Sequence, residues 1–276
     1  MMGCLRLTNL SVGVSILMLG LMASLCDAQT INLEEAASIW LFEEGKGNTT
    51  KDLTANGNHA EFNGNPQWTK GRFGQGLKFD GGSDYLSVKD SDSLDVEGEA
   101  LTLMAWVKAD GWPSGWNHII RKTPENPRIY ILGVHSSALP FMFLKTVAQQ
   151  YDDIQGKTKL PTKKWIHLAM TYNGKVIIIY VNGEPDATEP AKGKIEASDD
   201  ELRIGRGAPA GYLAGTLDEV AVFRVALSQN QIKSVMEVGF EVSLSVDLSQ
   251  ANKDTQTITR CYLAVQIKLR QSSQTK

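Results

Sequence analysis

The sequence has little cysteine and no excess of basic charge, and each shortage excludes a class of protein. Three cysteines in 276 residues are too few for a scaffold held together by disulfides. Lys and Arg total 28 and Asp and Glu total 31, so the formal net charge is -3. The chain therefore lacks the basic field of nucleic-acid-binding proteins, and we expect no nucleic-acid partner. The hydrophobic content of 42% excludes a disordered chain.

Long hydrophobic runs are also scarce, and the notable one lies at the N-terminus. Leu10–Leu25 is apolar or small throughout, and Arg6 is the only charge before it. This run is short for crossing a bilayer, which takes about 20 residues. Cys26 and Ala28 place small residues where signal peptidase needs them. We predict a signal peptide over residues 1–28, with an N-terminal membrane anchor as the alternative.

The predicted signal peptide determines how many cysteines the mature chain would keep and where the protein is expected to be located. Cys4 and Cys26 would leave with the signal peptide, so only Cys261 would remain. A single thiol forms no internal disulfide, so stability must come from core burial, helped by a metal ion if one binds. We expect a secreted, periplasmic or cell-surface protein with no membrane span in the mature chain.

Short strands dominate the mature sequence. Leu101–Lys108 alternates with apolar groups on both faces, which is typical of a strand between two layers. Val176–Val181 is a continuous run rich in β-branched residues, and the pairs Asn173-Gly174 and Asn182-Gly183 indicate hairpin turns on either side. Further strands are predicted over 38–43, 76–79, 85–88, 117–121, 128–134, 141–146, 165–172, 202–205 and 215–223.

Only one helix is predicted, and it comes late. Ser228 and Gln231 form a capping box, and an apolar stripe follows through Glu237. Strands without crossover helices indicate antiparallel pairing, and about a dozen of them need two packed sheets. We predict an all-β fold, an antiparallel two-sheet β-sandwich of the jelly-roll kind over residues 29–247. Residues 248–276 are predicted to form a loosely ordered tail, with an added edge strand over 261–269 as the alternative.

Five sequence blocks between residues 38 and 239 carry a family resemblance. They read IWLFEEGKGNTTKDLTANGNHAEFNG, GRFGQGLKFDGGSDYLSV, LTLMAWVKAD, KKWIHLAMTYNGKVIIIYVNG and RIGRGAPAGYLAGTLDEVAVFRVALSQNQI. In this order they resemble bacterial LamG-like jelly-roll domains of the concanavalin A-like lectin/glucanase superfamily. The resemblance implies the fold but no single function, because the superfamily holds lectins, carbohydrate-binding modules, glycosidases and adhesion modules.

The best candidate for metal chemistry is the loop from residue 52 to residue 59. It concentrates side-chain oxygens around a tight turn, and Ca²⁺ takes six to eight such ligands. The resemblance implies a structural calcium between this loop and the closing strand. Asp52 and Asp218 would supply carboxylates, and Asn56, Gly57 and Asn58 would supply amide or carbonyl oxygens. The alternative is that these side chains only cap turns.

A ligand-binding surface is marked weakly by aromatic residues in loops. Trp112 and Trp116 lie on one predicted loop, and Tyr151 and Tyr212 lie on others. Sugar rings stack on exposed aromatic rings, so these four side chains are candidates for carbohydrate binding. The alternative for the two tryptophans is a small satellite core beneath their loop.

One acidic string raises the question of catalysis. Glu184–Glu189 fits the Glu-x-Asp-x-x-Glu pattern, which resembles the catalytic string of β-glucanases on this fold. Those acids must point together into a cleft. Pro185 and Pro190 argue against the central strand that this needs. We therefore find no convincing catalytic constellation in the sequence.

The expected function is a secreted, non-enzymatic module that recognises extracellular carbohydrate and carries a structural calcium ion. A protein-adhesion or structural cell-surface module is the first alternative, so the partner is an extracellular glycan or a cell-surface protein. A glucanase-type glycoside hydrolase is the second alternative.

Overall fold

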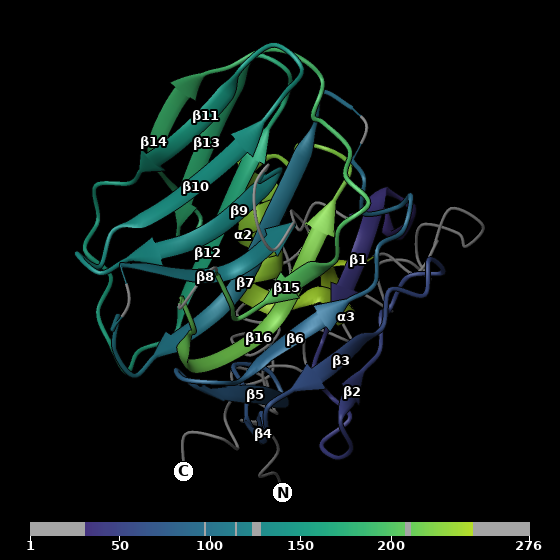
Figure 1. Cartoon of the computed structure of the whole chain (residues 1–276), viewed down its shortest axis with the longest axis vertical. Helices are drawn as coiled ribbons and strands as arrows, with labels where there is room; N and C mark the ends of the chain where they lie inside the picture. Colours follow the sequence, from purple (N-terminus) through teal and green to yellow (C-terminus); the bar gives the residue numbers. More distant parts are fainter. Residues whose placement is uncertain (1–30, 97, 114, 123–127, 208–210, 245–276) are drawn as a thin grey trace, which may run out of the picture.

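The computed structural model describes residues 31–244, except 97, 114, 123–127 and 208–210 (Figure 1). The predicted signal peptide, the predicted tail and all three cysteines lie outside the described residues. Among the helices described, none has the length and apolar character to cross a membrane.

Two antiparallel sheets form the body of the fold (Figure 1). Sheet I has the order β14 (Glu184–Pro190), β13 (Val176–Val181), β12 (Ile166–Tyr172), β7 (Leu101–Ala109), β16 (Ala214–Phe223), β5 (Gln75–Asp80) and β4 (Gln67–Lys70), and β1 (Ala36–Trp40) also pairs with β16. Sheet II has the order β11 (Gln150–Gln155), β10 (Pro140–Lys145), β9 (Tyr130–His135), β8 (Trp116–Lys122), β15 (Leu202–Ile204), β6 (Tyr85–Val88), β3 (Ala60–Asn63) and β2 (Thr49–Thr50). The predicted antiparallel β-sandwich is confirmed.

The main core fills the space between the two sheets. Alternate residues of β7, beginning with Leu101 and Leu103, point into it, as do Leu86 and Val88 of β6. The other face of β7 is apolar as well, because Met104 packs in a second cluster behind sheet I. This second contact explains why both faces of the predicted strand carry apolar groups.

The helices cover the outer face of sheet I. Helix α2 (Gln229–Val238) begins at the predicted capping box, with Ser228 as its N-cap. Its residue Val235 packs with Phe240 of α3 (Phe240–Ser243) against the outer face of sheet I (Figure 1). A 3-10 turn, η1 (Leu33–Glu35), precedes β1. The sequence predicted α2 alone, because the two shorter pieces have no periodic stripe.

The predicted hairpin turns are present. Asn182 and Gly183 have φ values of 50° and 76°, the left-handed pair that a two-residue hairpin loop needs. Asn173 caps the other turn by accepting the backbone N–H of Lys175 and of Val176 at its side-chain oxygen.

The sequence missed five strands: β2, β3, β4, β11 and β14. Four of these, β2, β4, β11 and β14, are edge strands with polar sequences, so no apolar alternation marks them. Trp165 also differs from expectation. It lies just before β12 and is half-buried, with its ring edge-on to Trp106 at 6.4 Å, instead of lying inside a core strand.

Candidate functional site

The outer face of sheet II carries the polar side chains that alternate with its core residues. In β6, Leu86 and Val88 point into the core, so Tyr85 and Ser87 point away from it. On the neighbouring β15, Arg203 lies opposite Ser87 in the register. These side chains therefore share one face.

The two halves of this face differ in exposure. Over β8–β10 it is filled by a small apolar cluster of Ile131, Phe141 and Phe143, with Trp116 packed against it. Over β3, β6 and β15 its side chains are half-buried or exposed. The accessible half is therefore the half near β3, and it is the half that holds polar groups.

A groove of about 470 Å³ opens at this accessible half. Its walls come from the 56–59 loop, from β3, from the segment 87–91 and from residue 201. The side chains that give it chemical character are Asn58, His59, Glu61, Ser87, Lys89 and Glu201. Donors and acceptors are mixed along the wall, which suits a ligand with many hydroxyl groups.

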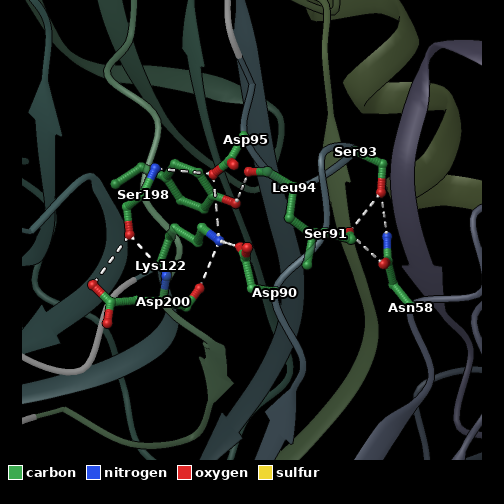
Figure 2. A network of polar contacts seen from close by, with 10 residues as sticks. Asn58, Asp90, Ser91, Ser93, Leu94, Asp95, Lys122, Ser198 and Asp200 are labelled. Carbon is green, nitrogen blue, oxygen red and sulfur yellow. Dashed lines mark hydrogen bonds and ion pairs between the residues drawn. The ribbon is translucent and has the colours of Figure 1, made fainter.

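Asn58 holds one wall of the groove in place (Figure 2). Its side-chain oxygen accepts the hydroxyl of Ser91 at 2.7 Å, and its amide nitrogen donates to Ser93 at 2.8 Å and to the carbonyl of Ala37 at 3.0 Å. Its own carbonyl accepts the indole N–H of Trp40 at 2.8 Å. The side chain is buried and its bonds join the groove to β1.

Lys122 anchors the same wall from beneath (Figure 2). Its side chain is fully buried, and its ammonium contacts the carboxylates of Asp90 and, at 3.4 Å, Asp95. It also donates to the carbonyl of Asp200 at 2.6 Å. A buried cation is tolerated only when it is paired and hydrogen-bonded, so these three loop residues are held to β8. Asp90 lines the groove, so this ion cluster fixes its shape.

Tyr130 borders this ion cluster in the core. Its hydroxyl donates to the carbonyl of Leu94 at 2.9 Å. Burial raises the pKa of Tyr130 well above its ordinary value, and the negative charges of Asp95 and Asp90 raise it further. The phenol therefore stays protonated and keeps its bond to the 90–96 segment.

Beside the groove, two tyrosines and an arginine form a stack. The guanidinium of Arg206 lies 4.6 Å from the ring centroid of Tyr85 and 5.1 Å from that of Tyr212. Arg203 also lies over Tyr85, at 5.4 Å, and its Nε donates to Glu201 at 2.5 Å. Glu201 lines the groove, so the stack and the groove are continuous.

Asp52 is a hydrogen-bonding hub within its loop. One carboxylate oxygen accepts the backbone N–H of Ile39 and of Thr54. The other accepts the hydroxyl of Thr54 and the backbone N–H of Asn58. A carboxylate has about four acceptor positions, so protein donors occupy all of them. Asn56 likewise donates its amide to the carbonyls of β1, and Gly57 makes the turn with φ 74°.

Asp218 lies at a bulge of β16. The register of β16 against β7 shifts between Asp218 and Ala221, and Glu219 there has φ 46°. One oxygen of Asp218 accepts the backbone N–H of Arg72 at 2.7 Å and of Phe73 at 2.9 Å. The other, Oδ1, is buried and has no hydrogen-bond partner among the residues described. Burial raises the pKa of Asp218 well above its ordinary value.

The predicted calcium ligands therefore differ in what they offer a cation. Asp52 and Asp218 have separate sets of hydrogen-bond partners, and only Asp218 retains a carboxylate oxygen with no partner. No group of three or more His, Cys, Asp and Glu side chains suited to a metal occurs among the residues described. Of the two carboxylates, that of Asp218 is the one with an oxygen left to meet a cation.

The four predicted aromatic ligands lie in different surroundings. Tyr151 is buried in the main core, and its hydroxyl accepts the backbone N–H of Lys192. Trp112 packs against that core, and Trp116 packs on Phe141 with ring centroids 4.8 Å apart. Tyr212 alone among the four belongs to the stack beside the groove.

The acidic string resembling a glucanase motif lies on the edge strand β14, as its prolines indicated. Glu184 pairs with Lys233 of α2 at 2.6 Å. Asp186 accepts the hydroxyl and backbone N–H of Thr158. The first two acids of the string thus serve separate contacts with neighbouring elements.

Sequence reasoning missed Tyr85, Arg203, Arg206 and the groove itself. A usable signal was present, because Tyr-Leu-Ser-Val and Leu-Arg-Ile alternate polar with core residues. That alternation marks which side chains leave the core. It does not say that β6 and β15 are neighbours, which only the sheet order shows.

The sequence of this chain is similar to a known protein family and to two curated relatives. A family model of laminin G type, described as the concanavalin A-like lectin/glucanases superfamily, matches residues 80–233, more than half of the chain. The chain belongs to this family. Pappalysin-1 from Mus musculus is 26% identical over 197 residues, and that from Homo sapiens is 27% identical over 201 residues. Each match covers 64% of this chain but 12% of the relative, so the chain spans about an eighth of these curated relatives' length.

Solved structures with the same fold include one domain solved with a sugar and several described as binding domains. Domain 4 of AbnA, an arabinanase from Geobacillus stearothermophilus solved with arabinotriose, matches with TM-score 0.59 and 14% identity, over 74% of this chain and 98% of that one. The binding domain of Paraclostridial Mosquitocidal Protein 1 gives TM-score 0.62 and 14% identity, over 74% and 52%. The binding domain of botulinum neurotoxin DC, solved with rat synaptotagmin II, gives TM-score 0.58 and 16% identity, over 75% and 52%. At these identities the likeness concerns the fold.

Proposed function

We propose that this protein is an exported module that binds extracellular carbohydrate in the groove on the outer face of sheet II. The observation that carries the proposal is the 470 Å³ groove, whose polar wall continues into two part-exposed tyrosine rings. Export rests on the predicted signal peptide, which gives a mature protein starting at Gln29.

The chemistry of the groove supports a sugar ligand. Carboxylate, amide, hydroxyl and ammonium groups line it together, and each can bond a sugar hydroxyl. Beside the groove, Tyr85 and Tyr212 keep part of their rings exposed despite the arginines stacked on them, and the C–H face of a sugar can stack on this remaining surface. A fold neighbour solved with arabinotriose shows that this architecture can carry a carbohydrate ligand.

A matched pair of variants tests the location of the site. Glu61 lies in the groove and Glu237 is exposed on α2, so Glu61→Ala and Glu237→Ala make the same change on opposite sides of the molecule. Glycan-array screening of the wild-type protein identifies bound oligosaccharides, and calorimetry gives their affinities. We expect Glu61→Ala to weaken binding about tenfold, the loss of one charge-assisted hydrogen bond, and Glu237→Ala to leave it unchanged.

Two outcomes would overturn the proposal. If no glycan on the array binds with calcium present, the ligand is not a carbohydrate. If Glu61→Ala and Glu237→Ala lose the same affinity, the groove is not the binding site. A protein ligand is the second candidate, because a fold neighbour was solved with synaptotagmin II. Capture of a defined cell-surface protein that Glu61→Ala abolishes, together with a blank array, would replace the first proposal by this one.

We also propose a structural calcium ion held at the bulge of β16. The buried oxygen of Asp218 that has no partner among the described residues supports it. Of the other predicted ligands, Asp52 and Asn56 are engaged by protein partners, so the proposal rests on Asp218. Calcium should raise the thermal unfolding midpoint and a chelator should lower it. Asp218→Asn should abolish the calcium shift, whereas a shift unchanged in that variant would contradict the site.

A further inference from the structure

Three acidic side chains that line the groove are paired with cations, whereas the nearby Arg206 has no carboxylate partner among the described residues. The ion pairs are Glu61 with Lys89 at 3.9 Å, Asp90 with Lys122, and Glu201 with Arg203 at 2.5 Å. Arg206 differs, since it forms no ion pair with any carboxylate in the described part of the chain. The stack beside the groove therefore carries a positive charge that no carboxylate of the described residues neutralises.

The guanidinium of Arg206 is already oriented. It lies over the rings of Tyr85 and Tyr212, at 4.6 and 5.1 Å, and its Nε is buried with no protein acceptor. Burying an N–H of a cation without an acceptor costs free energy, and an anion placed beside the guanidinium offsets part of that cost through its charge. Stacking also removes much of the freedom that an arginine side chain must lose when it binds.

A planar guanidinium with free donors matches one class of partner. Its fork of N–H groups fits a carboxylate or a sulfate better than it fits a hydroxyl. Arg206 lies beyond the lining of the groove and is linked to it by contacts: it stacks on Tyr85, which Arg203 also overlies, and Arg203 is paired with Glu201 in the groove wall. A short oligosaccharide lying in the groove would thus bring a substituent to Arg206.

We propose that the groove binds an acidic glycan and that its carboxylate or sulfate group docks on Arg206. This inference rests on the proposed carbohydrate-binding function and narrows its ligand class. The hydroxyl groups of the sugar would bond the paired side chains of the groove. The anionic group would take the position of the missing counter-ion.

The experiment uses matched ligands. In the carboxyl-reduced form of trigalacturonate each carboxylate is replaced by a neutral hydroxymethyl group, and a heparin hexasaccharide and its desulfated form provide a sulfate pair. Calorimetry on the full folded protein should show at least one acidic member binding tenfold or more tightly than its neutral partner. Equal affinity within both pairs would overturn the inference and leave the carbohydrate proposal standing, whereas no binding of either acidic or neutral glycans on an array would remove both.

Matched arginine variants test the docking group. Arg224 is exposed at the end of β16, where its guanidinium bonds the carbonyl of Glu34, and thus provides the control. Arg206→Gln should abolish the preference for the acidic ligand, a loss of about tenfold, and leave the neutral ligand's affinity unchanged. Arg224→Gln should change neither. Equal losses in the two variants would contradict the assignment.

Two further measurements keep the assignment falsifiable. Arg206→Lys preserves the charge but removes the fork, so it should recover only part of the preference that Arg206→Gln loses. Full recovery would show that a point charge suffices and would overturn the docking geometry. Hexaglutamate binding as tightly as the acidic glycan, with the same sensitivity to Arg206→Gln, would show that the site reads charge alone and would overturn the glycan class.

Discussion

The outer faces of the two sheets are built from the same alternation but are used differently. Behind sheet I, helices α2 and α3 bury Met104, Phe223 and their neighbours in a second apolar cluster. On sheet II, the half of the outer face near β3 keeps Tyr85, Arg203 and a polar groove accessible. One sheet thus covers its outer face with helices, and the other leaves half of its outer face accessible.

The contrast between the two sheets shows that a strand with apolar residues on both faces needs a covering element on its outer side. Met104 in β7 needs a cover, and the chain supplies it by folding its last helices back over sheet I. β6 carries Tyr85 and Ser87 at the equivalent positions, which need no cover. The position of the helices follows from the sequence of the strands, and so does the location of the groove.

The largest expected effect comes from removing a side chain that covers sheet I. Phe240 is fully buried against Phe223, with ring centroids 5.9 Å apart. Phe240→Ala should lower the free energy of unfolding by about 3–5 kcal/mol, because it removes a buried aromatic ring and leaves a cavity. Tyr212→Ala, on the part-exposed stack of sheet II, should cost about 1 kcal/mol. Urea unfolding measures both.

Ligand binding sharpens the same comparison. Per folded molecule, Phe240→Ala should bind glycan as wild type does, whereas Tyr212→Ala should bind it less tightly. The opposite result, in which Phe240→Ala weakens glycan binding and Tyr212→Ala lowers only stability, would contradict the assignment of different roles to the two faces.

The next effect concerns the ion cluster beneath the groove. Lys122→Met should lower the free energy of unfolding by about 3 kcal/mol or more, because it leaves the carboxylates of Asp90 and Asp95 near the core without their cation. Lys78→Met removes the exposed pair with Asp110 and should cost less than about 1 kcal/mol. Thermal and urea unfolding compare the two, and equal costs would show that Lys122 is not the anchor of the groove wall.

Much of this architecture was predictable from local sequence. Alternation along Leu101–Lys108, the Asn-Gly turns and the capping box at Ser228 each gave the right element, because each reflects contacts between near neighbours. The strands β4 and β11 were not predictable, because their polar edge sequences are ordered by pairing with a partner strand.

The candidate site was less predictable than the fold. The loop at Asp52 was identified from its oxygen-rich sequence, yet its carboxylate is filled by protein donors that come partly from Ile39 in another element. Arg206 lies next to Tyr85 only because β15 and β6 are neighbours in sheet II. Pairings across more than a hundred residues leave no mark in a single sequence.

The smallest expected effect compares one buried histidine from each outer face. Burial lowers the pKa of His167, behind sheet I, to about 3. It lowers the pKa of His118, on sheet II, to about 3 as well, helped by the charges of Arg121 and Arg128. Between that value and the unfolded pKa of about 6.5, only the unfolded chain binds the proton, so stability falls as pH falls. Each histidine should contribute a loss of about 2 kcal/mol between pH 7 and pH 5.

Replacing each ring by phenylalanine separates the two faces. Both nitrogens of His167 are buried and have no partner in the described part of the chain, so His167→Phe should raise stability at pH 7 by about 1 kcal/mol and flatten the pH profile. His118 shares a hydrogen bond with Arg121 at 3.3 Å, so His118→Phe should flatten the profile but lower stability at pH 7. Urea unfolding at pH 7 and at pH 5 measures the free energy of unfolding of both variants, and of the wild-type protein for comparison. If His167→Phe instead loses stability at pH 7, the nitrogens of His167 have hydrogen-bond partners, such as bound water. The outer face of sheet I would then contain satisfied polar groups beneath its helices, and the contrast with sheet II would be weaker.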